Sequence, residues 1–352
     1  MRYIRFLKTP RVVDGKNSPK ASVHSLITIT SDLGDSFLPN DLLLSVELIS
    51  AVTEEVIVWT RVKWTGGMRT LPITLPLSRS RALCPLRVRV GVEPKAKFDE
   101  YGTLSSEDSK GVVSAWSGPL DPTRGAEEAV KLVERRFRVA DRHTVHMWEE
   151  TGESIARHIW DAGVAVTYHL EHVLSMFDTK DFTVYAEEQR NLRVLELGTG
   201  CGIVGICIAQ SLENSDVILT DLPEAKDIVK RNIKESALAQ GTTLSFLELD
   251  WEHESLDELN TLAPLDLVIT ADCTYNPDSS PALVNTMARI TRTSPNVAVA
   301  VAMKVRHSSE DIFFQLMAEA GFQTTNSMTF PLPGDEKSCE ETVDVYFYRR
   351  GA

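Results

Sequence analysis

The stretch Val194-Leu195-Glu196-Leu197-Gly198-Thr199-Gly200-Cys201-Gly202 decides how this chain folds, because an apolar run ends in an acid and a glycine-rich turn follows. The apolar residues 192–197 predict a buried parallel strand, and residues 203–209 predict the start of a helix. Glycines between a strand and a helix let backbone N–H groups approach a ligand that a Cβ atom would keep away. The stretch therefore predicts a nucleoside-binding turn.

The glycine spacing alone leaves the ligand open. Gly200-x-Gly202-x-x-Gly205 also satisfies the fingerprint of dinucleotide-binding proteins, which is weak evidence on its own. Glu196 favours a different ligand, because a carboxylate two residues before Gly198 would repel a pyrophosphate. The same carboxylate suits the cationic methionine end of S-adenosylmethionine (SAM). We therefore expect SAM, with a nicotinamide-dependent dehydrogenase as the alternative.

The composition is that of an ordinary globular protein. The chain has 352 residues, of which 43% are hydrophobic and 25% are charged, and this length has room for two domains. The sequence contains no apolar stretch long enough to span a bilayer, so no membrane anchor is expected. Five cysteines lack paired or C-x-x-C spacing, which indicates a reducing compartment, the cytoplasm or nucleus, and neither a zinc site nor disulfides.

Charge is distributed unevenly along the chain. The formal net charge is −13, yet residues 1–98 carry 15 Lys and Arg against 8 Asp and Glu. The remainder therefore carries about −20, an acidic balance that argues against binding to a nucleic-acid backbone. The basic N-terminal part could dock an acidic partner, although a solvated strand face explains its charge as well. The sequence leaves the oligomeric state open.

Residues 1–98 predict a β-rich module, a small sandwich or barrel. Short strands are expected in residues 1–11, 42–49 and 86–90, and a hairpin is expected from residues 56–64 and 68–77 around Gly66-Gly67. Residues 99–128 are rich in Ser, Gly, Pro and acids, and they predict a polar linker before a second domain at 129–352. That domain is expected to begin with a short helix at 127–135, paired strands at 137–149 and a helix opened by Ser154.

From residue 191 the pattern alternates between strand and helix. Strands are predicted at 192–197, 216–220, 243–249, 265–271 and 296–303, and helices at 203–212, 225–239, 281–291 and 310–320. This alternation predicts an α/β fold with a parallel sheet and right-handed crossovers. Residues 326–332 and 342–348, joined by Pro333-Gly334-Asp335, add an antiparallel pair. Five parallel strands with a terminal hairpin are typical of the seven-stranded, Rossmann-like class I methyltransferase sheet.

Ligands of an open parallel sheet lie beyond the carboxyl ends of its strands, so strand-end residues are the candidates. Asp221 follows the second strand, where it would accept hydrogen bonds from the ribose hydroxyls, and Trp251 follows the third, where it would stack on adenine. Asp272 and Tyr275 follow the fourth strand and are the candidates for the chemistry. The expected cofactor contacts from these strand ends are Glu196, Gly198, Thr199, Gly200, Asp221, Trp251 and Ala271. Cys273 is predicted to be a small buried residue, and the histidines predict no metal site.

These motifs resemble methyltransferase family 16, the seven-β-strand protein-lysine methyltransferases that act on elongation factors, chaperones and similar proteins. The resemblance covers residues ~140–350 through the Glu196 motif, Thr220-Asp-Leu-Pro-Glu, Asp250-Trp and the D-x-x-Y run from Asp272 to Tyr275. It implies that Trp160, in Ile159-Trp-Asp-Ala-Gly, contacts the cofactor, and that Lys304-Val-Arg-His is the segment after strand five. The middle of D-x-x-Y, usually aliphatic, is Cys273-Thr274 here.

The resemblance implies methyl transfer from SAM to a lysine of a protein substrate, a reaction that depends mainly on placement. We expect Asp272 to capture and orient the amine, Tyr275 to provide an aromatic wall, and the sulfonium to favour loss of the proton. The alternatives are a methyltransferase of RNA or a small molecule, and a non-catalytic adaptor that binds SAM structurally. The β-rich module would select the substrate.

Overall fold

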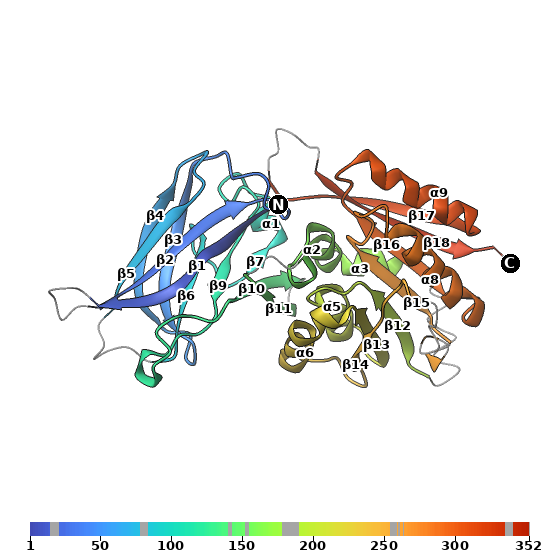
Figure 1. Cartoon of the computed structure of the whole chain (residues 1–352), viewed down its shortest axis with the longest axis horizontal. Coiled ribbons are helices and arrows are strands. Elements are labelled where there is room, and N and C mark those ends of the chain that lie inside the picture. Colours follow the sequence, from blue (N-terminus) through green and yellow to red (C-terminus); the bar gives the residue numbers. More distant parts are fainter. Residues whose placement is uncertain are drawn as a thin grey trace. The chain divides into compact units, whose positions relative to one another are not determined.

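The computed structural model describes residues 1–14, 21–77, 84–139, 143–151, 155–177, 190–253, 259, 261–262, 264–334 and 341–351. The chain divides into two compact units (Figure 1). The first unit comprises Met1–Arg138, His146–Ile155 and Pro333–Ser338, and the second comprises Val139–Val145, Ala156–Leu332 and Cys339–Ala352.

The first unit is a sandwich of two sheets. One sheet has the order β5-β2-β1-β8 and the other β11-β10-β9-β6-β3-β4, with β7 paired to β10. The strands are β1 (Arg2–Asp14), β2 (Ala21–Thr30), β3 (Leu42–Ser50), β4 (Val56–Trp64), β5 (Leu71–Leu77), β6 (Leu86–Val92), β7 (Asp99–Glu100), β8 (Val112–Val113), β9 (Ala115–Ser117), β10 (Leu132–Val139) and β11 (His143–Glu150).

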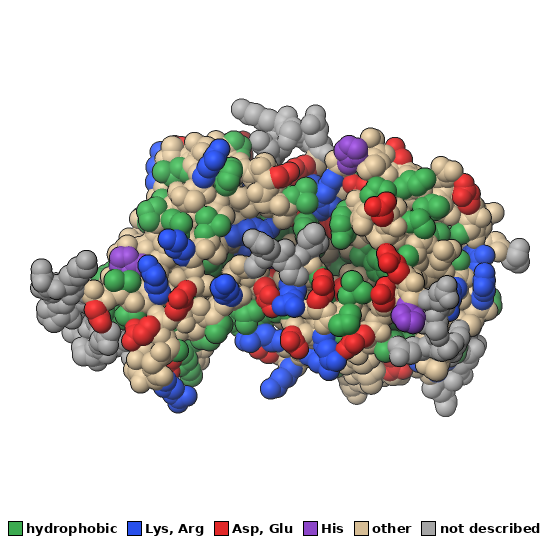
Figure 2. All heavy atoms as spheres, in the orientation of Figure 1, with side chains coloured by type: hydrophobic (Ala, Val, Ile, Leu, Met, Phe, Trp, Pro, Cys, Tyr) green, Lys and Arg blue, Asp and Glu red, His purple; other side chains and the backbone are tan. Residues whose placement is uncertain are grey.

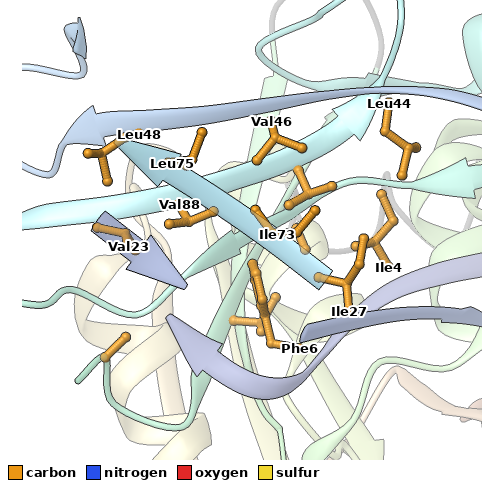
Figure 3. Close-up of a cluster of buried hydrophobic side chains, with 14 of the residues drawn as sticks. Ile4, Phe6, Val23, Ile27, Leu44, Val46, Leu48, Ile73, Leu75 and Val88 are labelled. Atoms are coloured by element: carbon orange, nitrogen blue, oxygen red, sulfur yellow. The ribbon is translucent and has the colours of Figure 1, made fainter. Parts of the chain in front are cut away.

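Alternating apolar residues of both sheets form one core between them. Ile4 and Phe6 of β1 and Ile27 of β2 meet Leu44 of β3 and Val88 of β6 in this core, and all five side chains are at most 4% exposed (Figure 3). Side chains on alternate positions of a strand point to the same face, so each strand contributes every second residue to the core. Burial of this shared face holds the two sheets together.

The predicted hairpin of residues 56–64 and 68–77 is wrong. β4 pairs with β3, whereas β5 pairs with β2 in the other sheet, so residues 65–70 carry the chain from one sheet to the other. The connection is anchored to the chain before β3, because the backbone N–H of Gly66 donates to Asp41 at 2.9 Å. A Cβ atom on Gly66 would lie 2.1 Å from the carbonyl oxygen of Pro39. The two glycines thus serve a sheet-to-sheet crossing rather than a tight turn.

Residues 99–128 also differ from the expected linker, because they contribute β7, α1 (Tyr101–Leu104), β8 and β9 to the first unit. The helix predicted over 127–135 is wrong as well, since β10 begins at Leu132. Its charged residues are buried in pairs: Arg135 contacts Glu149 at 2.6 Å, and Arg87 contacts Glu134 at 2.5 Å. These charged residues form ion pairs with residues of neighbouring strands. Their number made the sequence of the segment look like that of a solvent-exposed helix.

The second unit contains a seven-stranded sheet with the order β14-β13-β12-β15-β16-β18-β17. The first five strands are parallel to one another, and β18 runs antiparallel to both of its neighbours, β16 and β17, which confirms the predicted α/β fold. The strands are β12 (Leu192–Leu197), β13 (Ser215–Asp221), β14 (Thr243–Glu248), β15 (Leu267–Ala271), β16 (Ala298–Met303), β17 (Phe322–Pro331) and β18 (Thr342–Arg350).

The helices between these strands confirm four predictions. They are α5 (Ile203–Ser211), α6 (Lys226–Glu235), α8 (Ser280–Thr293) and α9 (Ile312–Glu319). The single helix expected after residue 153 is instead divided into η2 (Ile155–Arg157), α2 (Asp161–Tyr168) and α3 (Leu170–Ser175), and Ser154 lies outside the described residues. Among the described residues, no helix has the length and apolar character needed to cross a membrane. Charged side chains of both signs are interspersed with hydrophobic ones on the face drawn in Figure 2.

Candidate cofactor and acceptor site

The turn after β12 has the backbone conformation that its glycines allow. Gly198, Gly200 and Gly202 have φ angles of 66°, 56° and 91°, all in the left-handed region that side chains disfavour. A Cβ atom on Gly198 would lie 2.4 Å from Sγ of Cys273 and 3.2 Å from the ring of Trp251. The turn therefore has room for glycine alone at this position.

Glu196 stabilises this turn through hydrogen bonds to its side chain. Its side chain is buried, and Oε2 accepts hydrogen bonds from the Thr199 hydroxyl at 2.6 Å and from the backbone N–H of Gly205 at 3.0 Å. A Cβ atom on Gly205 would lie 2.6 Å from the same oxygen, so the absence of a side chain at Gly205 permits this contact. Burial raises the pKa of the Glu196 carboxyl to about 8. Glu196 and Thr199 thus act on the conformation of the turn.

Asp221 ends β13, the strand beside β12, and its carboxylate reaches the same turn. Oδ2 accepts from the backbone N–H of Gly200 at 2.7 Å, and Oδ1 accepts from that of Leu222 at 2.8 Å. Burial raises the pKa of Asp221. The structure thus brings Asp221 and the glycine turn together, as the sequence predicted.

Trp251 follows β14 and packs over Gly198. Its indole Nε1 is buried and has no hydrogen-bond partner among the described residues. A buried indole N–H normally finds an acceptor, so this atom indicates a position that a polar ligand completes. The preceding Asp250 is exposed and accepts from the backbone N–H of Glu252 at 3.0 Å.

The D-x-x-Y run turns sharply after Ala271, the last residue of β15. Asp272 has a φ of 56°, and its side chain is 3% exposed. Oδ2 accepts from the backbone N–H of Ala162 at 2.7 Å, and Oδ1 accepts from Nη1 of Arg306 at 2.7 Å. Both carboxylate oxygens are thus engaged within the protein. This geometry favours a positioning role over the expected capture of the acceptor amine.

Cys273 and Tyr275, which follow Asp272, differ in their exposure to solvent. Cys273 is buried, and its thiol lies 3.4–3.5 Å from the carbonyl oxygens of Ala271, Leu197 and Gly198, as expected for a structural residue. Tyr275 is 49% exposed. Leu222 after β13 and Val305 after β16 are also exposed, at 41% and 48%. Exposed apolar side chains therefore follow three strand ends of the sheet.

Trp160 caps α2 and belongs to a charged cluster that the sequence did not reveal. The guanidinium of Arg306 lies 5.6 Å from the centre of a Trp160 ring. Asp161, fully buried, accepts from Nζ of Lys304 at 2.8 Å, and this ammonium also contacts Glu341 at 3.0 Å. The motifs around Trp160 and Lys304 were both visible in the sequence. Their pairing was not, because more than 140 residues separate them.

The residues present fit SAM. The glycine turn has left-handed backbone that leaves no Cβ atoms on the ligand side of a strand end, Asp221 lies where a ribose is bound in nucleotide-binding sheets, and the buried Nε1 of Trp251 has no hydrogen-bond acceptor among the described residues. The segment that leads to Trp160 lies beside the turn, because the carbonyl oxygens of Ala156 and His158 lie 3.4 Å and 3.8 Å from a Cβ position on Gly200. The expected cofactor residues around Gly198 and Gly200 are thus brought together, while Ala271 contributes the strand end that carries Asp272.

Comparison with known proteins agrees with this geometry. A UPF0665 family protein of Schizosaccharomyces pombe is 25% identical over 315 residues, which cover 88% of this chain and 91% of that protein. Calmodulin-lysine N-methyltransferase of Arabidopsis thaliana is 30% identical over 156 residues, covering 44% of this chain and 45% of that enzyme. EEF1A lysine methyltransferase 3 of Mus musculus is 28% identical over 165 residues, covering 47% and 63%.

The similarity to the two named enzymes thus spans 45% of the length of one and 63% of the length of the other. A family model described as lysine methyltransferase matches residues 139–320, more than half of the sequence. This chain therefore belongs to the lysine methyltransferase family.

Proposed function

We propose that this protein transfers a methyl group from SAM to the side-chain amine of a lysine in a protein substrate. SAM is the cofactor of the family to which the chain belongs. The observation that carries the proposal is a glycine turn that is hydrogen-bonded to two carboxyl groups. Thr199 of the turn donates to Glu196, and the backbone N–H of Gly200 donates to Asp221. We further propose that the sheet order is that of the class I methyltransferases, with β12 as the first strand of the core.

Each residue at the turn has a separate task in this proposal. Glu196 and Thr199 fix the turn, and the backbone at Gly198 and Gly200 borders the methionine part of the cofactor. Asp221 accepts hydrogen bonds from the ribose hydroxyls, because each of its carboxylate oxygens has a further lone pair. Trp251 contacts adenine and provides the N–H that is buried without a partner. Trp160 borders the cofactor from the segment before α2.

The acceptor lysine enters where Tyr275 is exposed. Tyr275 provides an aromatic wall for the aliphatic stem of the lysine, and Leu222 and Val305 offer apolar surface to the residues on either side of it. The bound cofactor supplies an electrophilic methyl group on a positively charged sulfur. The protein's task is to hold a neutral amine in line with that methyl group and to keep water out of the path. Asp272 contributes by fixing the start of α2 and the turn that carries Tyr275.

We propose a separate role for the first unit, which is substrate selection. Its exposed Trp59 lies under the cations of Arg61 and Lys95, at 4.9 Å and 5.1 Å from the ring. These two cations pair with Glu93 and Glu47 at 3.3 Å and 3.0 Å, so the surface that we propose to contact a partner protein is the exposed ring of Trp59. The four described cysteines, Cys84, Cys201, Cys207 and Cys273, are free, which fits a protein that works in the cytoplasm or nucleus.

The test begins with calorimetric titration of SAH, the demethylated product of SAM, and of NAD into the purified chain. We expect binding of SAH in the micromolar range and no signal with NAD. Tritiated SAM and a protein extract are then incubated with the chain, and the labelled material is hydrolysed and separated into amino acids. Label in methylated lysine supports the proposal. Label that nuclease or dialysis removes would assign the chain to RNA or small-molecule methylation, and SAH binding without transfer would make it an adaptor.

A further inference from the structure

We propose that Arg306 masks the negative charge of Asp272, so that the acceptor lysine enters a neutral site and keeps its amine in the uncharged, nucleophilic form. The inference rests on the lysine methylation proposed above, and it makes Arg306 a positioning residue of that reaction. It also replaces the expected direct contact between Asp272 and the acceptor amine.

The ion pair between the two residues is built into the protein. Nη1 of Arg306 lies 2.7 Å from Oδ1 of Asp272, and the side chains are 13% and 3% exposed. The same Nη1 lies 3.2 Å from the carbonyl oxygen of Lys304, which fixes the guanidinium from its own segment. The second oxygen of Asp272 is occupied by the backbone N–H of Ala162. Oδ1 of Asp272 also accepts from the backbone N–H of Lys304 at 3.3 Å, so three groups of the protein bind this buried carboxylate.

The side chains of the other charged groups on this segment have partners of their own, although Oε2 of the buried Glu310 has none among the described residues. Lys304 directs its ammonium to Asp161 and Glu341, and Glu310 accepts from the backbone N–H groups of Arg306 and His307. Burial raises the pKa of the Cys273 thiol to about 12 and also raises the pKa of Tyr275, so both are neutral near pH 7. The guanidinium of Arg306 is therefore the group that compensates Asp272 on the side facing Trp160.

The location of the pair gives this compensation a chemical consequence. Arg306 lies over a ring of Trp160, and Asp272 precedes Tyr275 by three residues in the turn after β15, so the pair contacts one aromatic residue of the proposed site and begins the segment that carries the other. A lysine ammonium has a reference pKa near 10.4, and a carboxylate within ~4–6 Å would raise it by about one to three units. A neutral Asp272–Arg306 pair avoids that increase and leaves the positive sulfonium to favour loss of the proton.

The step itself is balanced once the amine is neutral. Its lone pair forms the N–C bond, and the electrons of the breaking S–C bond stay on sulfur to give SAH. The methylated product is then an ammonium, which releases its proton to water. The rate below the pKa of the bound lysine is proportional to the fraction of neutral amine, so the charge around Asp272 appears in the pH profile.

The test compares four proteins: the wild type, Arg306→Met, Asp272→Asn and the double variant that carries both changes. Asn accepts the left-handed backbone of Asp272 and keeps an oxygen for Ala162. Incorporation of tritium from saturating SAM into lysine of extract proteins is measured from pH 6.5 to 10. Calorimetric binding of SAH shows that each variant retains the cofactor site.

Opposite shifts are expected for the two single changes. Arg306→Met leaves Asp272 unmasked and should move the acidic limb of the profile up by about one pH unit, a loss of about tenfold at pH 7.5 that closes toward pH 10. Asp272→Asn leaves Arg306 unopposed and should move the limb down. The double variant, neutral at both positions, should return it to the wild-type position, and Arg306→Lys should stay close to wild type.

Other results would overturn the inference. If Arg306→Met slows transfer by one factor at every pH, its role is structural. If Asp272→Asn abolishes transfer at every pH but still binds SAH, Asp272 captures the amine directly. If Arg306→Met does not bind SAH, the test rests on Asp272→Asn. An acidic limb of its pH profile that does not move down would then overturn the inference. A wild-type protein that methylates no lysine would refute the proposed function, whereas lysine methylation with coincident profiles would refute the charge masking alone.

Discussion

Glu196 has a buried carboxyl group that accepts two hydrogen bonds and so fixes the backbone of the glycine turn. Its Oε2 accepts hydrogen bonds from Thr199 within the glycine turn and from Gly205 in α5, the helix that follows the turn. Burial raises the pKa of Glu196 to about 8, so the free protein carries this group mostly protonated at neutral pH. In the free protein, the role of Glu196 is therefore to fix the conformation of the turn rather than to provide a negative charge for the cofactor.

The raised pKa of Glu196 predicts a pH dependence of stability. The folded protein retains the proton up to about pH 8, whereas the unfolded chain loses it near 4.5, so the free energy of unfolding falls as the pH rises between these values. The slope is at most about 1.4 kcal/mol per pH unit. Glu196→Gln keeps a carbonyl oxygen for Thr199 and Gly205 but does not titrate. The fall in Tm from pH 5.5 to 8 should be smaller for Glu196→Gln than for the wild type; parallel curves would show that Glu196 is ionised throughout.

At the scale of elements, a buried ion pair ties the start of α2 to the end of β16. Asp161 and Lys304 come from segments far apart in the chain, and their side chains are 0% and 10% exposed. Removing one partner of a buried pair leaves a charge without compensation, which costs about 3–5 kcal/mol. This pair thus fixes the segment that presents Trp160 relative to the strand ends.

Lys304→Met should accordingly destabilise the second unit by about 3 kcal/mol, because Asp161 has no access to solvent. Thermal unfolding measures this loss, and adding Asp161→Asn should recover part of it. The matched control is Lys226→Met, which breaks an ion pair with Glu248 in which both side chains are 42% exposed. The control should lower the Tm far less, because solvent screens an exposed ion pair. Equal effects of the two Lys→Met changes would mean that Asp161 is not buried as described.

The same contrast between local and distant contacts explains what could be predicted from the sequence. The parallel sheet follows from local patterns: β12 was placed at both ends, and the glycine turn, Asp221 and Trp251 come directly after apolar runs. The partner of a strand in an antiparallel sandwich is set by contacts across the chain, so β4 and β5 were joined incorrectly. The segment that carries Lys304 and Arg306 was visible in the sequence, but their pairing with Asp161 and Asp272 was not, because a charged residue is expected in solvent until its distant partner is known.

For the whole molecule, two compact units predict two thermal transitions, of which SAH moves one. A ligand at about 100 times its Kd stabilises the state that binds it by about 2.7 kcal/mol, which raises the Tm of a unit of this size by roughly 5–10 °C. Lys304→Met should lower the same transition. Arg135→Met breaks the buried pair with Glu149 in the first unit and should lower the other.

Scanning calorimetry of the full chain with and without SAH tests this assignment, and Arg135→Met serves as the matched control because it also removes one partner of a fully buried pair. SAH affinity should survive Arg135→Met, since the residues proposed to hold the cofactor all belong to the second unit. A single transition that SAH and both variants move together would show that the units unfold as one. In that case the first unit would support the methyltransferase unit's stability, and a selective role in substrate choice could no longer be separated from folding.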